Sequence, residues 1–388
     1  MKILLVSNYY YPEHLGGVEV VSYNLVKYYR IFGNSVRWLA ADVPPKFRQV
    51  VEGDVPIRAW NIAEESLGFP HPILFPRFIS RIWGSLQWCD VLHLQDCLYP
   101  INILSFLFAK VLRKPILITQ HAKVIPYRQL YKMILQFLGY STVGRLMLWG
   151  ADKTVFVTAN VRDAMQYLVP SVKFDVMPNG VDTELFAPLA GNERARLREQ
   201  LSGSTERPII LFVGRLVERK GVHLIRPLIE KYQDWFWVLV GRPDDFNPSE
   251  WHLPNLKHLQ DLSEDELSRL FACADILVHP SVGEGVTLTV SNSLACGTPV
   301  LISEESLYEL DSEARKIFYV VSPETNDIEE KLNLALSDRV RLENLRAACR
   351  DFVVSRLSWK KMCERYSELL SEIVVRGSKR KNSNKSVI

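Results

Sequence analysis

Short apolar segments alternate with helical patterns along most of this 388-residue chain, and this alternation restricts the fold more than any other feature. Strands and helices in regular succession form parallel sheets with helices on both faces, an α/β architecture. The length suits two domains, and 47% hydrophobic residues are enough for a core in each. The predicted strands are Ile3–Ser7, Ser35–Ala40, Val91–Leu94, Ile116–Thr119 and Lys153–Thr158 in the first half, and Ile209–Val213, Phe236–Val240, Ile276–His279, Val300–Ser303 and Phe318–Val321 in the second.

The segment from Gly283 to Val300 places one carboxylate, Glu284, in a glycine-flanked turn directly before a predicted helix. A helix N-terminus offers unpaired N–H groups and about half a positive charge, which suit a diphosphate. The carboxylate can accept hydrogen bonds from sugar hydroxyls. The segment therefore predicts a site for a nucleotide sugar, which carries both kinds of group.

Two cations follow a predicted strand further upstream. The apolar run from Pro208 to Val213 leads into Gly214 and Arg215, and Lys220 follows five residues later. Open α/β sheets bind ligands beyond the carboxyl ends of their strands. We therefore expect Arg215 and Lys220 to clamp a diphosphate and to stabilise it as a leaving group.

Further ordered motifs accompany these two. The first half contains NYYYPEHLGGVE, DVLHLQD, ITQHA and VMPNGVDTELFAP, and the second contains DLSEDELSRLFACADILVHPS and ACGTPV. With the strand, Gly, Arg and Lys element, they give residues 1 to 375 a pattern that resembles the retaining glycosyltransferases of family 4 (GT4).

The resemblance implies the GT-B fold, in which two Rossmann-like, doubly wound parallel-sheet domains face a cleft. Residues 1–180 would form the acceptor-side domain and residues 181–357 the nucleotide-sugar domain. A helix over 358–375 would cross back to the first domain. The remaining segment, 376–388, has five cations and no acid, and is predicted to be disordered.

The resemblance also assigns roles to individual residues. Glu284 would orient the donor sugar, His121 would lie against that sugar near the reacting carbon, and Asn292 would bind the nucleotide ribose. The segment that ends at Leu262 would contact the base through its backbone. The other donor-binding residues that it implies are Gly16, Gly17, Gly214, Gly285, Val286, Thr287 and Leu288. For His93 and Asp96, beside another strand end, an acceptor role stays open.

Two positions depart from the family pattern. Members carry Glu where this chain has Asn292, and Gly-Phe-Gly where it has Gly285-Val286-Thr287. An amide can still hydrogen-bond a ribose, although as a neutral acceptor. Weaker donor binding would be the mild consequence. The alternatives are a catalytically silent homologue that binds a nucleotide sugar or partner subunit, and a GT-B sugar-nucleotide epimerase.

Retention in this family is described as a reaction on one face of the sugar, and no motif here offers the carboxylate that a double displacement would need. The donor's own phosphate oxygen would help to take the acceptor proton. This scheme requires no metal or other cofactor, and the chain has no Asp-x-Asp triplet of the metal-dependent glycosyltransferases. The six cysteines show no paired metal-ligand spacing and are expected to be reduced, structural thiols. The turn after the first strand lacks the Gly-x-Gly-x-x-Gly of a dinucleotide-binding dehydrogenase.

Between Asp96 and Asp152 the chain has no acidic residue, and cations alternate with aromatic side chains there. Such a surface can lie on an anionic membrane, although a core helix pair with solvated cations would have the same composition. No apolar stretch approaches the roughly 20 residues that span a bilayer. We therefore expect a cytoplasmic protein that is peripheral on the inner face of the membrane. Nucleic acid is not an expected partner, since the net charge is only +3 and no binding module occurs.

Taken together, these features predict a retaining hexosyltransferase. It would move a sugar from a nucleotide-diphosphate donor to a saccharide or lipid-linked acceptor, in surface polysaccharide or glycolipid biosynthesis. The sequence does not specify the base, the sugar, the acceptor, the linkage or the oligomeric state.

Overall fold

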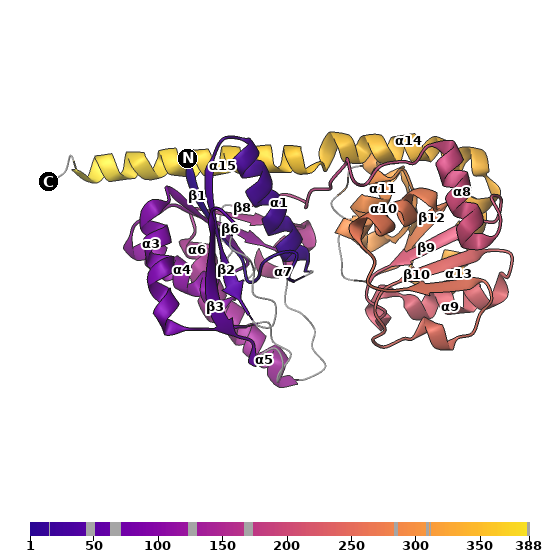
Figure 1. Ribbon diagram of the computed structural model, residues 1–388, viewed down its shortest axis with the longest axis horizontal. Coiled ribbons are helices and arrows are strands. Elements are labelled where there is room, and N and C mark those ends of the chain that lie inside the picture. The colour runs from indigo at the N-terminus through magenta and orange to yellow at the C-terminus, as the bar shows by residue number, and fades with distance from the viewer. Residues whose placement is uncertain are drawn as a thin grey trace. The chain divides into compact units, whose positions relative to one another are not determined.

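The structure, a computed structural model, describes residues 1–14, 16–43, 51–62, 71–122, 130–166, 174–282, 286–307, 310 and 312–385 (Figure 1). The chain divides into two compact units. Unit 1 consists of Met1–Pro178 and Trp359–Ile388, and unit 2 consists of Asn179–Ser358. Each unit is built on its own sheet with helices on both faces, so the predicted α/β class with two parallel-sheet domains is confirmed.

Unit 1 has an eight-stranded sheet in the order β4-β3-β2-β1-β5-β6-β7-β8, parallel except for the β3–β4 pair. Successive side chains of β1 point to opposite faces, so Ile3 packs with Tyr29 and Tyr366 whereas Leu4 packs with Ile82 and Ile101. The strands are β1 Lys2–Val6, β2 Ser35–Asp42, β3 Asp54–Trp60, β4 Ile73–Leu74, β5 Val91–Gln95, β6 Ile116–Gln120, β7 Lys153–Phe156 and β8 Phe174–Val176. The helices are α1 Gly17–Ile31, η1 Pro76–Phe78, α3 Ile79–Trp88, α4 Pro100–Val111, α5 Leu130–Gly139, η2 Tyr140–Gly144, α6 Arg145–Gly150, α7 Ala159–Gln166 and α15 Trp359–Lys385.

Unit 2 has a six-stranded parallel sheet in the order β11-β10-β9-β12-β13-β14. On one face Leu211 packs with Val290 of α11, and on the other Phe212 packs with Ile225 of α9. The strands are β9 Ile209–Val213, β10 Phe236–Val240, β11 Leu256–Leu259, β12 Ile276–His279, β13 Val300–Ser303 and β14 Phe318–Val321. The helices are α8 Gly191–Ser202, η3 Glu218–Lys220, α9 Val222–Lys231, η4 Pro248–Glu250, α10 Glu264–Cys273, α11 Leu288–Ala295, η5 Glu304–Leu307, α12 Ser312–Arg315, α13 Thr325–Ser337 and α14 Arg339–Arg356.

Each of the predicted strands is a strand in the structure, but β3, β4, β8 and β11 were not predicted. The prediction for the end of the chain is wrong: α15 does not stop at Val375 but continues to Lys385, so most of 376–388 is helical. Once a helix is nucleated, each added residue costs little, and Lys and Arg are good helix formers. All six cysteines are free and buried, as expected for structural thiols.

Candidate functional site

The sheet of unit 2 has a switch point between β9 and β12. These strands pair in parallel through Ile210 and Leu211, but the chain visits β10 and β11 on the other side of β9 before it returns to β12. Connections from neighbouring strands then leave toward opposite faces and open a crevice at the carboxyl ends, where α/β sheets bind ligands. The predicted cations follow β9, and the predicted helix follows β12.

The loop after β9 carries both predicted cations. Arg215 is exposed, and its Nη2 lies 2.5 Å from the Asp244 carboxylate. Lys220 is half-buried, and its side chain lies near Gly214 at the start of the loop. A Cβ added to Gly214 would be 3.9 Å from Cδ and Cε of Lys220. Gly241, at the end of β10, is needed for close approach, since a Cβ there would lie 2.0 Å from the carbonyl oxygen of Gly214.

This cation loop is tied to the segment that follows β12. The Val282 N–H donates to the Arg219 carbonyl at 3.0 Å, and the Ser281 hydroxyl lies 3.5 Å from the same oxygen. Gly221 packs on Pro280 so closely that a Cβ would come within 2.6 Å of the proline ring. The cations are therefore anchored beside the chain that leads to residues 283–285. The predicted Glu284 and Gly285 lie outside the described residues.

The helix predicted after this turn is α11. Its N-cap is Thr287, whose hydroxyl accepts from the Val290 N–H at 3.4 Å, and Leu288 is its first residue. Asn292 lies one turn further on and is half-buried, between the buried Ser291 and Ser293. The helix thus begins where a diphosphate site would need it, but the Thr287 hydroxyl is used in capping.

The end of β11 forms the next part of this edge. His258 Nε2 lies 2.8 Å from the Gly241 carbonyl, and its Nδ1 lies 2.7 Å from the Ser249 hydroxyl. The half-buried side chains of Leu262 and Val286 pack against the same hydrophobic cluster. Leu262 and Val286, two predicted donor-binding residues that are 24 positions apart, are therefore held by the same hydrophobic core.

In unit 1, the predicted glycines lie at the start of α1, after β1. They differ in what surrounds them. A Cβ on Gly16 would lie 2.0 Å from Glu19 Oε2, because that buried carboxylate folds back over the glycine. A Cβ on Gly17 would meet no other described atom within 4 Å. Gly16 is therefore explained by the Glu19 contact, and open space for a ligand's approach remains at Gly17.

His121 follows β6 and is held by two residues of β5 and its end. Its N–H donates to Asp96 Oδ1 at 2.9 Å, and its Nε2 lies 2.7 Å from Gln95 Oε1. Burial lowers the pKa of His121 to about 3, so the ring is neutral at physiological pH. Burial also raises the pKa of Asp96 to about 6, although the N–H groups of His121 and Ala122 oppose this shift.

Sequence reasoning missed the buried network behind His121. Gln95 Nε2 lies 3.0 Å from His93 Nε2, and His93 Nδ1 lies 3.1 Å from the Tyr29 hydroxyl. His93 is fully buried, and its pKa is lowered to about 3 by burial and, to a smaller extent, by His121. It therefore lies inside unit 1 and not at the surface that an acceptor could reach. The one sequence signal for this network is the spacing of His93 and Gln95, because residues two apart on a strand point to the same face of the sheet.

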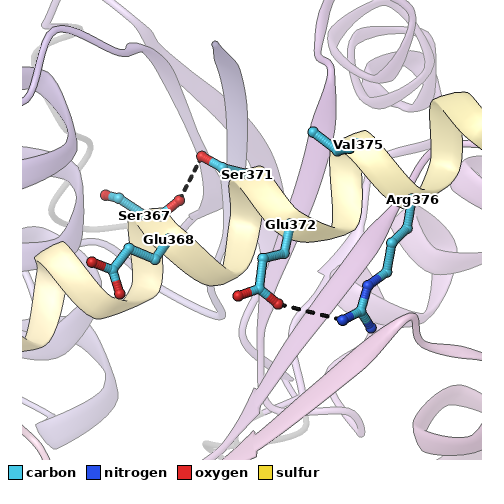
Figure 2. Close-up of a pocket in the computed structure, with 6 residues that line it drawn as sticks. All are labelled: Ser367, Glu368, Ser371, Glu372, Val375 and Arg376. Atoms are coloured by element: carbon cyan, nitrogen blue, oxygen red, sulfur yellow. Dashed lines mark hydrogen bonds and ion pairs between the residues drawn. The ribbon is translucent and has the colours of Figure 1, made fainter.

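A shallow pocket on α15 contains none of the predicted site residues. It is lined by Ser367, Glu368, Ser371, Glu372, Val375 and Arg376, which come from successive turns of one helix (Figure 2). The Ser371 hydroxyl donates to the Ser367 carbonyl at 2.8 Å, and Arg376 lies 3.6 Å from Glu372. These contacts lie within the helix itself, and we assign the pocket no function.

Comparison with known proteins finds matches to two glycosyltransferase sequence profiles. Residues 15–185 match the sequence profile of Glycosyltransferase Family 4, and residues 193–352 match that of Glycosyl transferases group 1. The chain is 24% identical over 343 residues to sulfoquinovosyl transferase SQD2 of Arabidopsis thaliana, covering 84% of this chain but only 65% of the plant protein. It is 25% identical over 403 residues to alpha-maltose-1-phosphate synthase of Mycolicibacterium smegmatis, covering 96% and 100%.

Among solved structures, sucrose-phosphate synthase from Thermosynechococcus elongatus is similar in fold. It superposes with a TM-score of 0.75 at 18% identity, covering 97% of this chain and 99% of that one. At this identity the likeness establishes the GT-B fold and not the substrate.

Proposed function

The chain belongs to the GT4-type glycosyltransferases, and from this premise we propose that it transfers a hexose, with retention, from a nucleoside diphosphate donor to a saccharide or lipid-linked acceptor. The observation that carries the proposal is the joined pair of loops in unit 2. Arg215 and Lys220 follow β9, and their loop is hydrogen-bonded to the segment that leads to Glu284 and α11. Cations and a helix N-terminus at one switch point suit a diphosphate.

In the proposed reaction the protein supplies position and charge. Arg215 and Lys220 neutralise the diphosphate as its bond to the anomeric carbon breaks, and Glu284 orients the sugar. The acceptor oxygen attacks from the face that the diphosphate leaves, and a phosphate oxygen of the donor takes its proton. His121 contacts the donor sugar as a neutral imidazole, and Asn292 bonds the ribose. The scheme needs no metal or cofactor.

A donor panel tests this function. UDP, GDP and ADP sugars are compared by thermal shift, since a ligand at 100 times its Kd stabilises by about 2.7 kcal/mol. The best donor, labelled in the sugar, is then incubated with glycolipid and saccharide acceptors. A product whose anomeric configuration matches the donor supports the proposal. Binding without transfer would identify a silent homologue, and conversion of the free donor sugar would identify an epimerase.

We also propose that the protein works at the inner membrane surface, in surface polysaccharide or glycolipid synthesis. Within the part of the chain that the structure describes, no helix is long and apolar enough to cross a bilayer. A different feature supports peripheral binding, namely the inverted burial of α5. Its polar Lys132 and Gln136 are half-buried, whereas its large apolar side chains are exposed: Leu130, Tyr131, Met133, Ile134, Leu135, Phe137 and Leu138.

A group of exposed apolar side chains on one helix marks an interaction site, and lipid is the partner that suits an acid-free surrounding sequence. We attribute the contact with the bilayer to these apolar side chains more than to the cations of the same region. Lys110 Nζ donates to the Gly150 carbonyl, and Lys114 Nζ donates to the Cys89 carbonyl at 2.6 Å. Both cations thus cap backbone groups, and α5 is the better candidate for contact with the bilayer.

A further inference from the structure

We infer that Gln95 is a positioning residue, whose side-chain amide fixes which ring nitrogen of His121 carries the proton. The inference rests on the proposed function for its consequence, since it concerns the imidazole that we place against the donor sugar. Its structural part stands on the hydrogen bonds alone.

The fully buried amide of Gln95 bridges two imidazoles. Its Oε1 lies 2.7 Å from His121 Nε2, and its Nε2 lies 3.0 Å from His93 Nε2. An amide oxygen only accepts and an amide nitrogen only donates. His121 therefore carries its proton on Nε2, and His93 has an unprotonated Nε2.

The other contacts of His93 fit this arrangement. With Nε2 unprotonated, its proton is on Nδ1, which donates to the Tyr29 hydroxyl at 3.1 Å. In this arrangement the Thr119 hydroxyl donates its one proton to His93 Nε2 at 2.8 Å in preference to the Tyr366 hydroxyl, which lies 3.2 Å away. Turning the amide over would require both imidazoles to change tautomer together. The bridge thus couples the two rings, and α1 and α15 anchor it from the interior.

The consequence concerns the second nitrogen of His121. When Nε2 donates to Gln95, Nδ1 is an acceptor, so the ring can receive a hydrogen bond from a sugar hydroxyl but cannot donate one. Tyr29, Tyr366 and Cys363 face the network from α1 and α15, and their pKa values are raised by burial. Asp96, with a pKa of about 6, is the group that titrates near neutrality. Above pH 7 the network therefore has one protonation state.

Nitrogen NMR of protein labelled with ¹⁵N-histidine at pH 7.5 reads this state directly, with His121→Gln used to identify the His121 signals. We expect a single tautomer with the proton on Nε2. In Gln95→Met we expect averaging of the two ring nitrogens and a fall in transfer rate on the order of tenfold or more. Gln120→Met is the matched control, because Gln120 is equally buried on β6 but bonds the Ala122 carbonyl and Tyr140.

The control should leave the His121 signals unchanged. A wild-type His121 protonated on Nδ1, or present as a tautomer mixture, overturns the inference even if no variant folds. So does an unchanged tautomer in folded Gln95→Met. The spectra need no substrate, so a missing transferase activity would refute the proposed function without touching this result.

Discussion

The two sheets end in edges of opposite chemistry. Beyond β9 in unit 2 the groups are charged and solvated: the Arg215 side chain is 69% exposed and is paired with Asp244, whose side chain is 42% exposed. At the ends of β5 and β6 in unit 1, burial keeps His93 and His121 neutral at physiological pH and raises the pKa of Asp96 to about 6. A solvated cation can move onto a phosphate with little desolvation cost, whereas a buried network holds one geometry. We therefore assign phosphate charge to unit 2 and hydroxyl recognition to unit 1.

Removing the charges of unit 2 should have the largest effect. Arg215→Ala and Lys220→Ala should each lower kcat on the order of a hundredfold or more, because both stabilise charge that develops on the leaving diphosphate. Arg226→Ala is the matched control, since Arg226 is also exposed and ion-paired, with Glu230 on α9. Steady-state kinetics with the best donor measure the effect. Near-normal kcat in both variants would show that Arg215 and Lys220 do not stabilise the leaving diphosphate. The assignment of phosphate binding to unit 2 and hydroxyl recognition to unit 1 would then be wrong.

The effect of burial at this end of the unit 1 sheet can be tested through stability. The pKa of Asp96 is raised from 3.8 to about 6 on folding, so the folded state binds the proton more tightly than the unfolded state. Ionisation of Asp96 therefore lowers stability as pH rises from about 4 to 6, and the cost persists above 6. Asp96→Asn removes this cost, while its amide oxygen can still accept from the His121 N–H.

Asp96→Asn should raise the free energy of unfolding by about 1 kcal/mol at pH 4.5 and by up to about 3 kcal/mol at pH 7.5. Urea unfolding of both proteins at the two pH values measures it. An equal difference at both values would show that burial does not raise the pKa of Asp96, and this end of the unit 1 sheet would then not differ from that of unit 2 in the cost of its charge.

The sequence predicted the two edges unequally well, for physical reasons. Ile209–Val213 is apolar throughout because both its faces are covered, and the Gly-Arg-Lys element after it is local in sequence. The Gln95 bridge depends on strand pairing, in which Gln95 lies opposite Thr119 of β6, and no local pattern gives that register. Asp54–Trp60 was missed because it contains Pro56, and proline is rare inside strands.

Helix surfaces extend the comparison. In unit 2 the exposed apolar residues are scattered, as Leu334 and Val340 are, whereas α5 of unit 1 gathers them on one helix. Ile134→Ser with Leu138→Ser should weaken binding to anionic liposomes about thirtyfold, because each apolar side chain that inserts partly into the bilayer contributes about 1 kcal/mol. Leu334→Ser with Val340→Ser is the control. Sedimentation with liposomes at low and high salt measures the binding of both variants and of the wild type. If the α5 variant bound like the wild type, or if high salt abolished wild-type binding, the membrane contact would be assigned to cations instead.

The smallest expected effect concerns the one neutral group that we place against the ribose in unit 2. Asn292 is half-buried on α11, in a position where the family carries Glu. In Asn292→Glu the carboxylate is a stronger acceptor for ribose hydroxyls than the amide, and the difference of about 1 kcal/mol should tighten donor binding about fivefold. Calorimetric titration with the best donor measures this change, and Asn292→Gln controls for side-chain length. A large loss of affinity with Glu but not with Gln would mean that the ribose subsite excludes negative charge. Arg215 and Lys220 would then be the charged groups of unit 2 that we place against the donor.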